Sequence, residues 1–142
     1  VGSEMCIRDR LNGALAGLVA ITAEPLTPGP ITAMFIGSIG AIIMYFGTKM
    51  LASYGLDDVV GAIPVHMFAG IFGTLVVPLT NSDTSFGTQF IGTASVCIFS
   101  FGLSWITFTL LKSPIGLRIS KAAENLRTDN AEVGVTAYSI RD

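Results

Sequence analysis

Four long stretches of the chain contain no Asp, Glu, Lys or Arg. They cover residues 11–23, 25–48, 59–82 and 84–111. A helix needs about 20 apolar residues to cross the hydrocarbon core of a bilayer, and the last three stretches reach that length. We therefore predict an all-α membrane protein with helices at about residues 11–23, 31–48, 59–79 and 88–111, all within a transmembrane region of residues 11–112.

The first ten residues differ sharply from the apolar stretch that follows them. Charged residues, among them Glu4, Arg8 and Arg10, stand directly before the apolar pattern. A signal peptide would have a basic start, an apolar run and then a small-residue cleavage site, and this order is not found here. The string MCIRDR resembles translated adaptor sequence, so we interpret residues 1–10 as a non-native leader. The stretch after it is then a spanning helix whose beginning is truncated, or else an interfacial segment.

The amino-acid composition argues against several classes of function. Hydrophobic residues make up 51% of the chain and charged residues 13%, against roughly a quarter charged in a soluble domain. The net charge of −2 and the scattered basic residues do not favour nucleic-acid binding. With a single histidine and no membrane-embedded cluster of Asp, Glu or Cys, we expect no metal site, no cofactor and no enzymatic activity.

The basic residues predict which side of the membrane each connection faces. Residues 24–30 and 80–89 contain no Lys or Arg, whereas Lys49 lies between the second and third stretches. Five more basic residues follow the fourth stretch: Lys112, Arg118, Lys121, Arg127 and Arg141. Because cytoplasmic loops carry the excess of Lys and Arg, we predict a multi-pass protein of the cell membrane with residues 113–142 as a cytoplasmic tail.

His66 is the only histidine of the chain and lies inside the uncharged third stretch. At helical spacing it shares a face with small residues such as Ala69 and Gly73, while bulkier residues gather on the opposite side. A polar residue at membrane depth is a functional-site candidate. Two interpretations stay open: His66 lines a narrow passage, or it is a buried neutral histidine that is hydrogen-bonded to a neighbouring helix.

Asp57 and Asp58 stand just before the same stretch. An acidic side chain at this place can accept hydrogen bonds from the free N–H groups of the first helical turn and suits the positive end of the helix dipole. Capping is therefore one interpretation of the pair, and a direct role in transport is the other.

Small residues also recur at helical spacing, which in lipid favours close helix packing. They form three groups: Gly13 and Gly17; Ala33, Gly37 and Ala41; Ala69 and Gly73. The pattern predicts a helical bundle and leaves its function open.

Three blocks resemble ammonium transporters of the Amt/Mep/Rh superfamily: LNGALAGLVAITA, GLDDVVGAIPVHMFAGIFGTL and FIGTASVCIFSFGLSWITFTLLKSPIGLRIS. Their order and spacing match the last four membrane helices of that family and cover nearly everything after Arg10. The resemblance implies an eleven-helix fold, in which two five-helix halves form an inverted repeat and an eleventh long helix follows. Three such subunits form a trimer. The chain would be the C-terminal fragment of one subunit.

The resemblance also implies a function for His66. Each subunit of these transporters has a narrow hydrophobic pore with two hydrogen-bonded histidines, one from each half, and His66 in VGAIPVH matches the second. Ammonium would lose a proton at the outer mouth, and ammonia would pass beside the imidazoles, because a naked ion is too costly in an apolar constriction. We expect the fragment alone to be inactive. A membrane ammonium sensor or another small-solute channel is the alternative function.

The C-terminal segment TDNAEVGVTAY resembles the tail motif of the family and retains four of its residues: Asp129, Glu132, Gly134 and Tyr138. In the family this tail contacts the neighbouring subunit and PII-type signal proteins, so such a protein is an expected partner. The chain departs from the family at Val133, which replaces the tail histidine, and at Val59, where a proline is usual.

Overall fold

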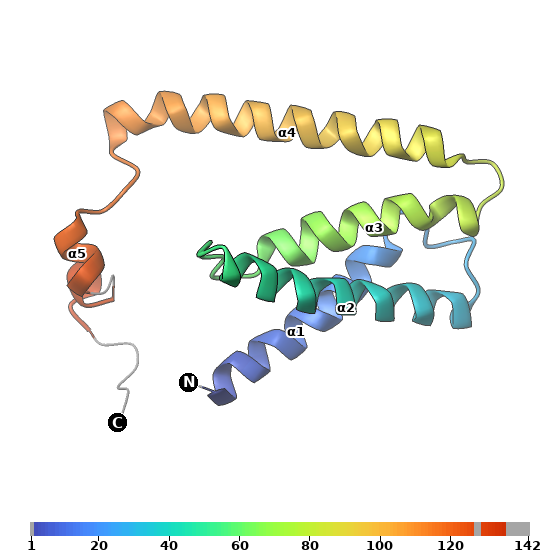
Figure 1. Ribbon diagram of the computed structural model, residues 1–142, viewed down its shortest axis with the longest axis horizontal. Coiled ribbons are helices and arrows are strands. Elements are labelled where there is room, and N and C mark those ends of the chain that lie inside the picture. Colours follow the sequence, from blue (N-terminus) through green and yellow to red (C-terminus); the bar gives the residue numbers. More distant parts are fainter. Residues whose placement is uncertain (1, 127–128, 136–142) are drawn as a thin grey trace. The chain divides into compact units, whose positions relative to one another are not determined.

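The computed structural model describes residues 2–126 and 129–135. All regular elements among these residues are helices, and none is a strand (Figure 1). The first residues form the helices α1 (Gly2–Ile21) and α2 (Pro30–Ser53). A continuous helical segment follows, made of the π-helical turn η1 (Ile63–Phe68), the helix α3 (Ala69–Val76) and the 3₁₀ turn η2 (Val77–Leu79). The remaining elements are α4 (Phe86–Ile115), α5 (Lys121–Leu126) and the π-helical turn η3 (Asp129–Val133). The predicted all-α class is confirmed for the described residues.

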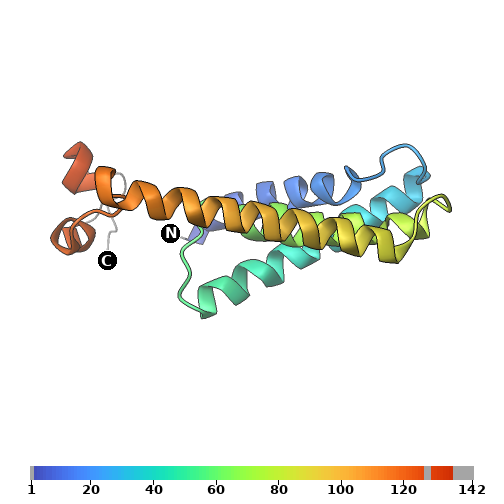
Figure 2. The same cartoon turned by 90° about the horizontal axis from the view of Figure 1, so that it is seen from above.

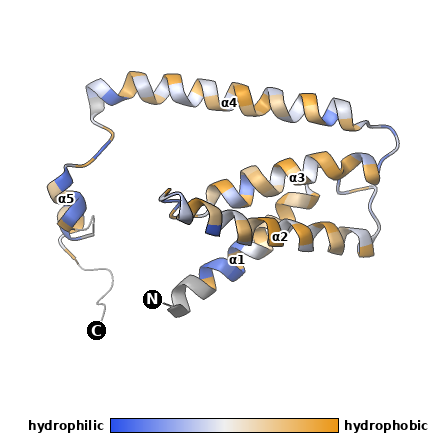
Figure 3. Ribbon diagram, in the orientation of Figure 1, coloured by the Kyte–Doolittle hydropathy of each residue, from blue (hydrophilic) through white to orange (hydrophobic). Residues whose placement is uncertain are grey.

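Two of these helices, α2 and α4, are long and apolar enough to cross a membrane. The continuous segment Ile63–Leu79 is shorter, at 17 residues, and spans about 26 Å at 1.5 Å per residue. It begins later than the predicted residue 59, because Gly61 has a positive φ of 78° and interrupts the helix there. Helix α1 continues back through the predicted leader, and Figure 3 shows hydrophilic residues at this end of it.

Helix α2 has local signals at both of its ends. Pro30 occupies the first turn, where its missing N–H costs nothing. At the other end, Gly55 has a φ of 69° and donates its N–H to the Ala52 carbonyl at 3.0 Å, while the Leu56 N–H bonds to the Leu51 carbonyl at 3.1 Å. This is the Schellman arrangement, which ends the helix at Ser53 instead of at the predicted residue 48.

Helix α1 packs against both α2 and α3 through small residues (Figures 1 and 2). A Cβ added to Gly17 would lie 3.1 Å from the Gly37 carbonyl oxygen, and one added to Gly40 would lie 2.6 Å from the Ala20 Cβ. Gly73 of α3 lies directly against the Ala20 backbone. Buried side chains from all three segments then meet in one small core: Ala16, Met44, Val65 and Ala69. The predicted small-residue packing is confirmed at Gly17, Gly37, Ala69 and Gly73.

The described residues from Cys97 on belong to a second compact unit. Within it, the Arg118 guanidinium lies 3.1 Å from the Glu124 carboxylate, and both side chains are exposed to solvent. An exposed ion pair of this kind contributes at most about 1 kcal/mol to stability.

Candidate functional site

His66 lies in the π-helical turn η1, and its side chain is exposed. The residues just before it, Pro64 and Val65, are buried in the core. Its exposed neighbours Ile63 and Met67 are apolar. The imidazole is therefore exposed on an apolar surface of the described residues.

The structure does not place His66 on the small-residue face predicted for it. The buried line is Val65, Ala69, Gly73 and Val77, and this line packs toward α1 and α2. The π-helical turn is the physical reason, because the Ala69 N–H donates to the Pro64 carbonyl five residues back and to that of His66. In a wider turn each residue advances by a smaller angle, so His66 lies farther round the helix from Ala69 than regular helical spacing predicts, while Val65 stays in line with Ala69.

Asp58 caps the start of the helical segment that carries His66. Its Oδ1 accepts hydrogen bonds from the N–H groups of Gly61 at 3.0 Å and Ala62 at 2.9 Å, and its Oδ2 accepts one from Ile63 at 2.8 Å. Partial burial raises the pKa of Asp58, but the three backbone hydrogen bonds and the nearby Arg8 charge outweigh this and hold it below the ordinary value. Asp58 is therefore held as a carboxylate, in the geometry expected of a cap.

Asp57, the other predicted residue of this pair, is exposed. No hydrogen bond or ion pair joins its side chain to another residue in the described ranges. The two acidic residues thus have different surroundings, and the capping geometry belongs to Asp58 alone.

Sequence reasoning missed Asn12, which holds the same turn from α1. The Asn12 Nδ2 donates a hydrogen bond of 2.9 Å to the Val60 carbonyl, 48 residues away in the sequence. Next to it, buried Gly61 lies so close that an added Cβ would be 2.5 Å from the Asn12 amide nitrogen. The signal for Asn12 was weak but present, since it is the only amide side chain among residues 11–21.

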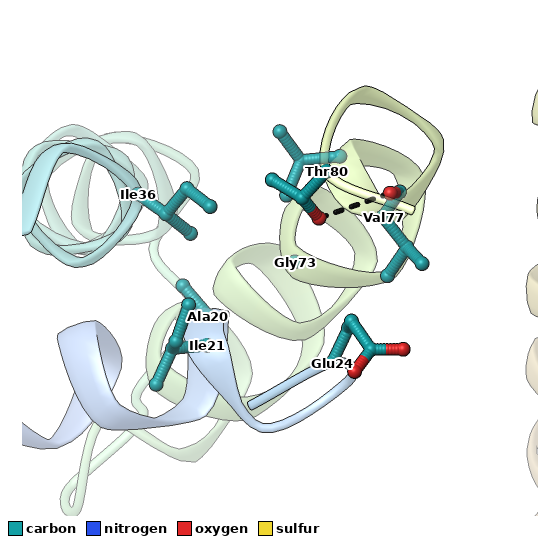
Figure 4. Close-up of a pocket in the computed structure, with 8 residues that line it drawn as sticks. Ala20, Ile21, Glu24, Ile36, Gly73, Val77 and Thr80 are labelled. Carbon is teal, nitrogen blue, oxygen red and sulfur yellow. Dashed lines mark hydrogen bonds between the residues drawn. The ribbon is translucent and has the colours of Figure 1, made fainter. Parts of the chain in front are cut away.

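A second polar contact lies at the opposite end of these helices. The Asn81 Nδ2 donates to the Glu24 Oε2 at 2.9 Å, and this bond is the main cause that lowers the pKa of Glu24. Beside it, a cavity of about 10 Å³, the size of one water molecule, is lined by Glu24, Thr80, Gly73 and Ala20 among others (Figure 4). The Thr80 hydroxyl donates to the Val77 carbonyl at 3.1 Å, which the figure also shows.

Comparison with the sequences of known proteins identifies the family of this chain. The sequence profile described as Ammonium Transporter Family matches residues 6–138. The chain belongs to the ammonium transporter family. It is 39% identical over 132 residues to a Synechocystis sp. protein provisionally named an ammonium transporter, which covers 86% of this chain and 24% of that protein.

Two further relatives give the same result. The ammonium transporter Amt2 of Archaeoglobus fulgidus is 36% identical over 148 residues, with 89% of this chain and 31% of the relative covered. An ammonium transporter of Corynebacterium glutamicum is 31% identical, with 90% and 32% covered. This member of the ammonium transporter family therefore spans about a quarter to a third of the length of the relatives that it matches.

The family match extends through the tail motif at residues 128–138. The structure describes only residues 129–135 of this motif. Asp129 begins η3, and Glu132 and Gly134 are exposed, with Gly134 at a φ of 72°. Tyr138 lies outside the described residues. In the described ranges no group of three or more His, Cys, Asp or Glu side chains is arranged to hold a metal ion.

Proposed function

We propose that this chain is the C-terminal part of a transporter that conducts ammonium or ammonia across the cell membrane, with His66 lining the substrate path. The observation that carries the proposal is the exposure of the only histidine on an apolar surface, in a chain of the ammonium transporter family. A histidine that only stabilised this bundle would be expected to bond within it.

The chemistry of the site suits ammonia. A neutral imidazole has one donor and one acceptor nitrogen, so it can exchange hydrogen bonds with ammonia or with a second imidazole. The exposed apolar side chains of Ile63 and Met67 beside it offer a naked ammonium ion no compensation for its lost hydration. Such a surface therefore favours the passage of the neutral molecule, with the proton handled separately.

A pore needs further walls, which the full-length protein would supply. In our proposal the protein has the eleven-helix inverted-repeat fold, and the other half contributes a second histidine that pairs with His66. Helices from one half form only one side of a passage between two repeats. We therefore expect the fragment of residues 1–142 to conduct no ammonia on its own.

The partners of the full-length protein belong to the same proposal. We infer a homotrimer, with a cytoplasmic tail in which Asp129, Glu132, Gly134 and Tyr138 contact a neighbouring subunit or a PII-type signal protein. Removal of residues 129–142 from the full-length protein should then reduce uptake while the trimer still assembles. Unchanged uptake at equal expression would contradict this role of the tail.

The proposed orientation has its own test. Ser53 is the last residue of α2 and Ser85 directly precedes α4; both are exposed, and we assign them to opposite sides of the membrane. A cysteine at Ser85 should react with an impermeant reagent added to intact cells, and one at Ser53 should not. The reverse pattern would contradict the orientation.

The role of His66 is tested by transport in vesicles that contain the purified full-length protein. Replacement H66A should impair methylammonium uptake and ammonia-driven pH change, because the pore loses its hydrogen-bonding group. Replacement M34A removes an exposed methionine of α2 that we do not place at the His66 surface, and it serves as the matched control. Normal transport by H66A would remove His66 from the substrate path, and specific ammonia flux through the fragment alone would show that one half is sufficient.

A further inference from the structure

The turn that precedes His66 is held at two ends by different elements. At one end, residues 58–61 are tied by Asp58 and by Asn12 of α1. At the other end, Val65 is only 2% exposed and packs in the core with Ala16, Met44 and Ala69. His66 directly follows Val65, so its backbone position depends on both anchors.

The backbone between the two anchors is unusual and needs support. Gly61 has a left-handed φ of 78°, and its carbonyl accepts the Val65 N–H at 3.1 Å, which links the turn to the first residues of η1. The π-helical turn itself has poorer intrinsic stability than an α-helix and is retained where other contacts stabilise it. A contact that fixes residues 60 and 61 therefore helps to keep His66 in this turn.

Two side chains of α1 reach this turn: the Arg8 guanidinium donates to the Val59 carbonyl at 3.1 Å, and Asn12 bonds one residue further on. The Asn12 amide nitrogen donates a hydrogen bond of 2.9 Å to the Val60 carbonyl, and the amide group fills the space that a side chain at residue 61 would occupy. Asp58 bonds only within its own segment and cannot fix that segment relative to α1. Asn12 and Arg8 thus both connect the turn before His66 to helix α1, and Asn12 is the one that bonds at residue 60 and lies against Gly61.

We propose that Asn12 is a positioning residue for His66, acting through the Val60 carbonyl and the space left by Gly61. The proposal rests on the proposed transport role of His66. Asn12 would not contact the substrate. Loss of its hydrogen bond loosens the backbone around residues 60 and 61 between the Arg8–Val59 bond and the core residue Val65, so that the imidazole occupies its working position for a smaller fraction of the time.

The test uses the full-length protein with the replacement N12A in lipid vesicles. Its matched control is S38A, which removes a hydroxyl of α2 that bonds only to its own helix, at the Met34 carbonyl. We expect the maximal rate of methylammonium uptake to fall about fivefold, as for the loss of one ordinary hydrogen bond. The KM should change little, since the path of entry is untouched, and S38A should match the parent protein.

Hydrogen exchange separates positioning from a general structural role. In N12A, amides of residues 59–66 should exchange faster, while those of residues 69–79 stay protected as in the parent protein. Faster exchange through both ranges would make Asn12 a general packing residue and overturn the proposal. Unchanged exchange at residues 59–66, or local exchange with an unchanged uptake rate, would overturn it as well.

A second variant covers the case in which N12A does not assemble. Replacement N12L keeps a side chain of similar volume beside Gly61 but removes the donor to the Val60 carbonyl, and the same local exchange and lower maximal rate are expected. Failure of both variants to assemble would make this contact a folding requirement and overturn a positioning role. Normal transport by H66A would instead contradict the proposed function, whatever the exchange result for N12A.

Discussion

Helices α2 and α4 are both long and apolar, yet they differ in how closely neighbouring segments pack against them. In α2, five residues at one face are buried: Ile36, Gly40, Met44, Gly47 and Leu51. In α4, no described side chain is buried, and an added Cβ at Gly92 or Gly102 would meet no atom within 4 Å. Apolar composition alone therefore predicts a membrane-compatible helix and says little about which faces pack.

The glycines of α2 explain its closeness to other segments. Gly47 makes room for the Phe68 ring and for Pro64, since an added Cβ would lie 2.5 Å from the Phe68 Cδ2. In lipid, helices gain little hydrophobic free energy from association, so such close contacts between small residues matter more than total apolar area. The glycines of α4 have no such partner among the described residues, and the two helices should therefore respond differently to added side-chain volume.

The largest expected effect is that of a bulky residue at Gly73, which lies against the Ala20 backbone. Because a backbone neighbour cannot rotate away, G73L should destabilise the α1–α3 packing by about 3 kcal/mol or more. The measurement is unfolding of the chain in mixed detergent micelles, followed by circular dichroism. The matched control is G92L, which adds the same side chain to the part of α4 in the same compact unit, at a position where an added Cβ meets nothing within 4 Å, and should change the unfolding midpoint little. Equal effects of the two replacements would remove the distinction between these regions.

A smaller effect is expected at the cap before η1. Replacement D58A should cost about 1–2 kcal/mol, because three backbone N–H groups lose their acceptor. The adjacent D57A is the matched control and should stay within about 0.5 kcal/mol of the parent protein. If the two losses are equal, the capping role of Asp58 is wrong.

The cap also predicts a dependence on pH. Since the folded pKa of Asp58 is lowered, its contribution is fully present above the ordinary value of about 3.9 and is lost as pH falls through the lowered value. Unfolding curves at a series of acidic pH values should show this loss in the parent protein and a smaller one in D58N, in which residue 58 no longer titrates.

The smallest expected effect comes from single methyl groups. Replacement G92A should stabilise α4 by about 0.5–1 kcal/mol, because alanine is the better helix former and its Cβ meets nothing. Replacement G17A should lose that gain, because its Cβ would come within 3.1 Å of the Gly37 carbonyl oxygen. Thermal unfolding of the two variants measures the difference. A larger stabilisation from G17A than from G92A would contradict the close approach of α1 and α2.

The sequence by itself determined the all-α class, the approximate helices and the family resemblance. These features depend on local order: uncharged stretches long enough to span a bilayer, Pro30 at a helix start and acidic residues before the third stretch. Small residues at helical spacing also indicated packed faces, and Gly17, Gly37 and Gly73 do lie at close contacts.

Only the tertiary structure decided which residues face the core around His66. Periodicity assumed a regular α-helix through residues 59–79, and the π-helical turn moves His66 farther from the buried line that contains Val65 and Ala69. The contact from Asn12 to Val60 joins residues 48 apart, and a local pattern contains no information on such a pair. That contact requires α1 to lie against the turn at Gly61, an arrangement that exists only once the helices have met.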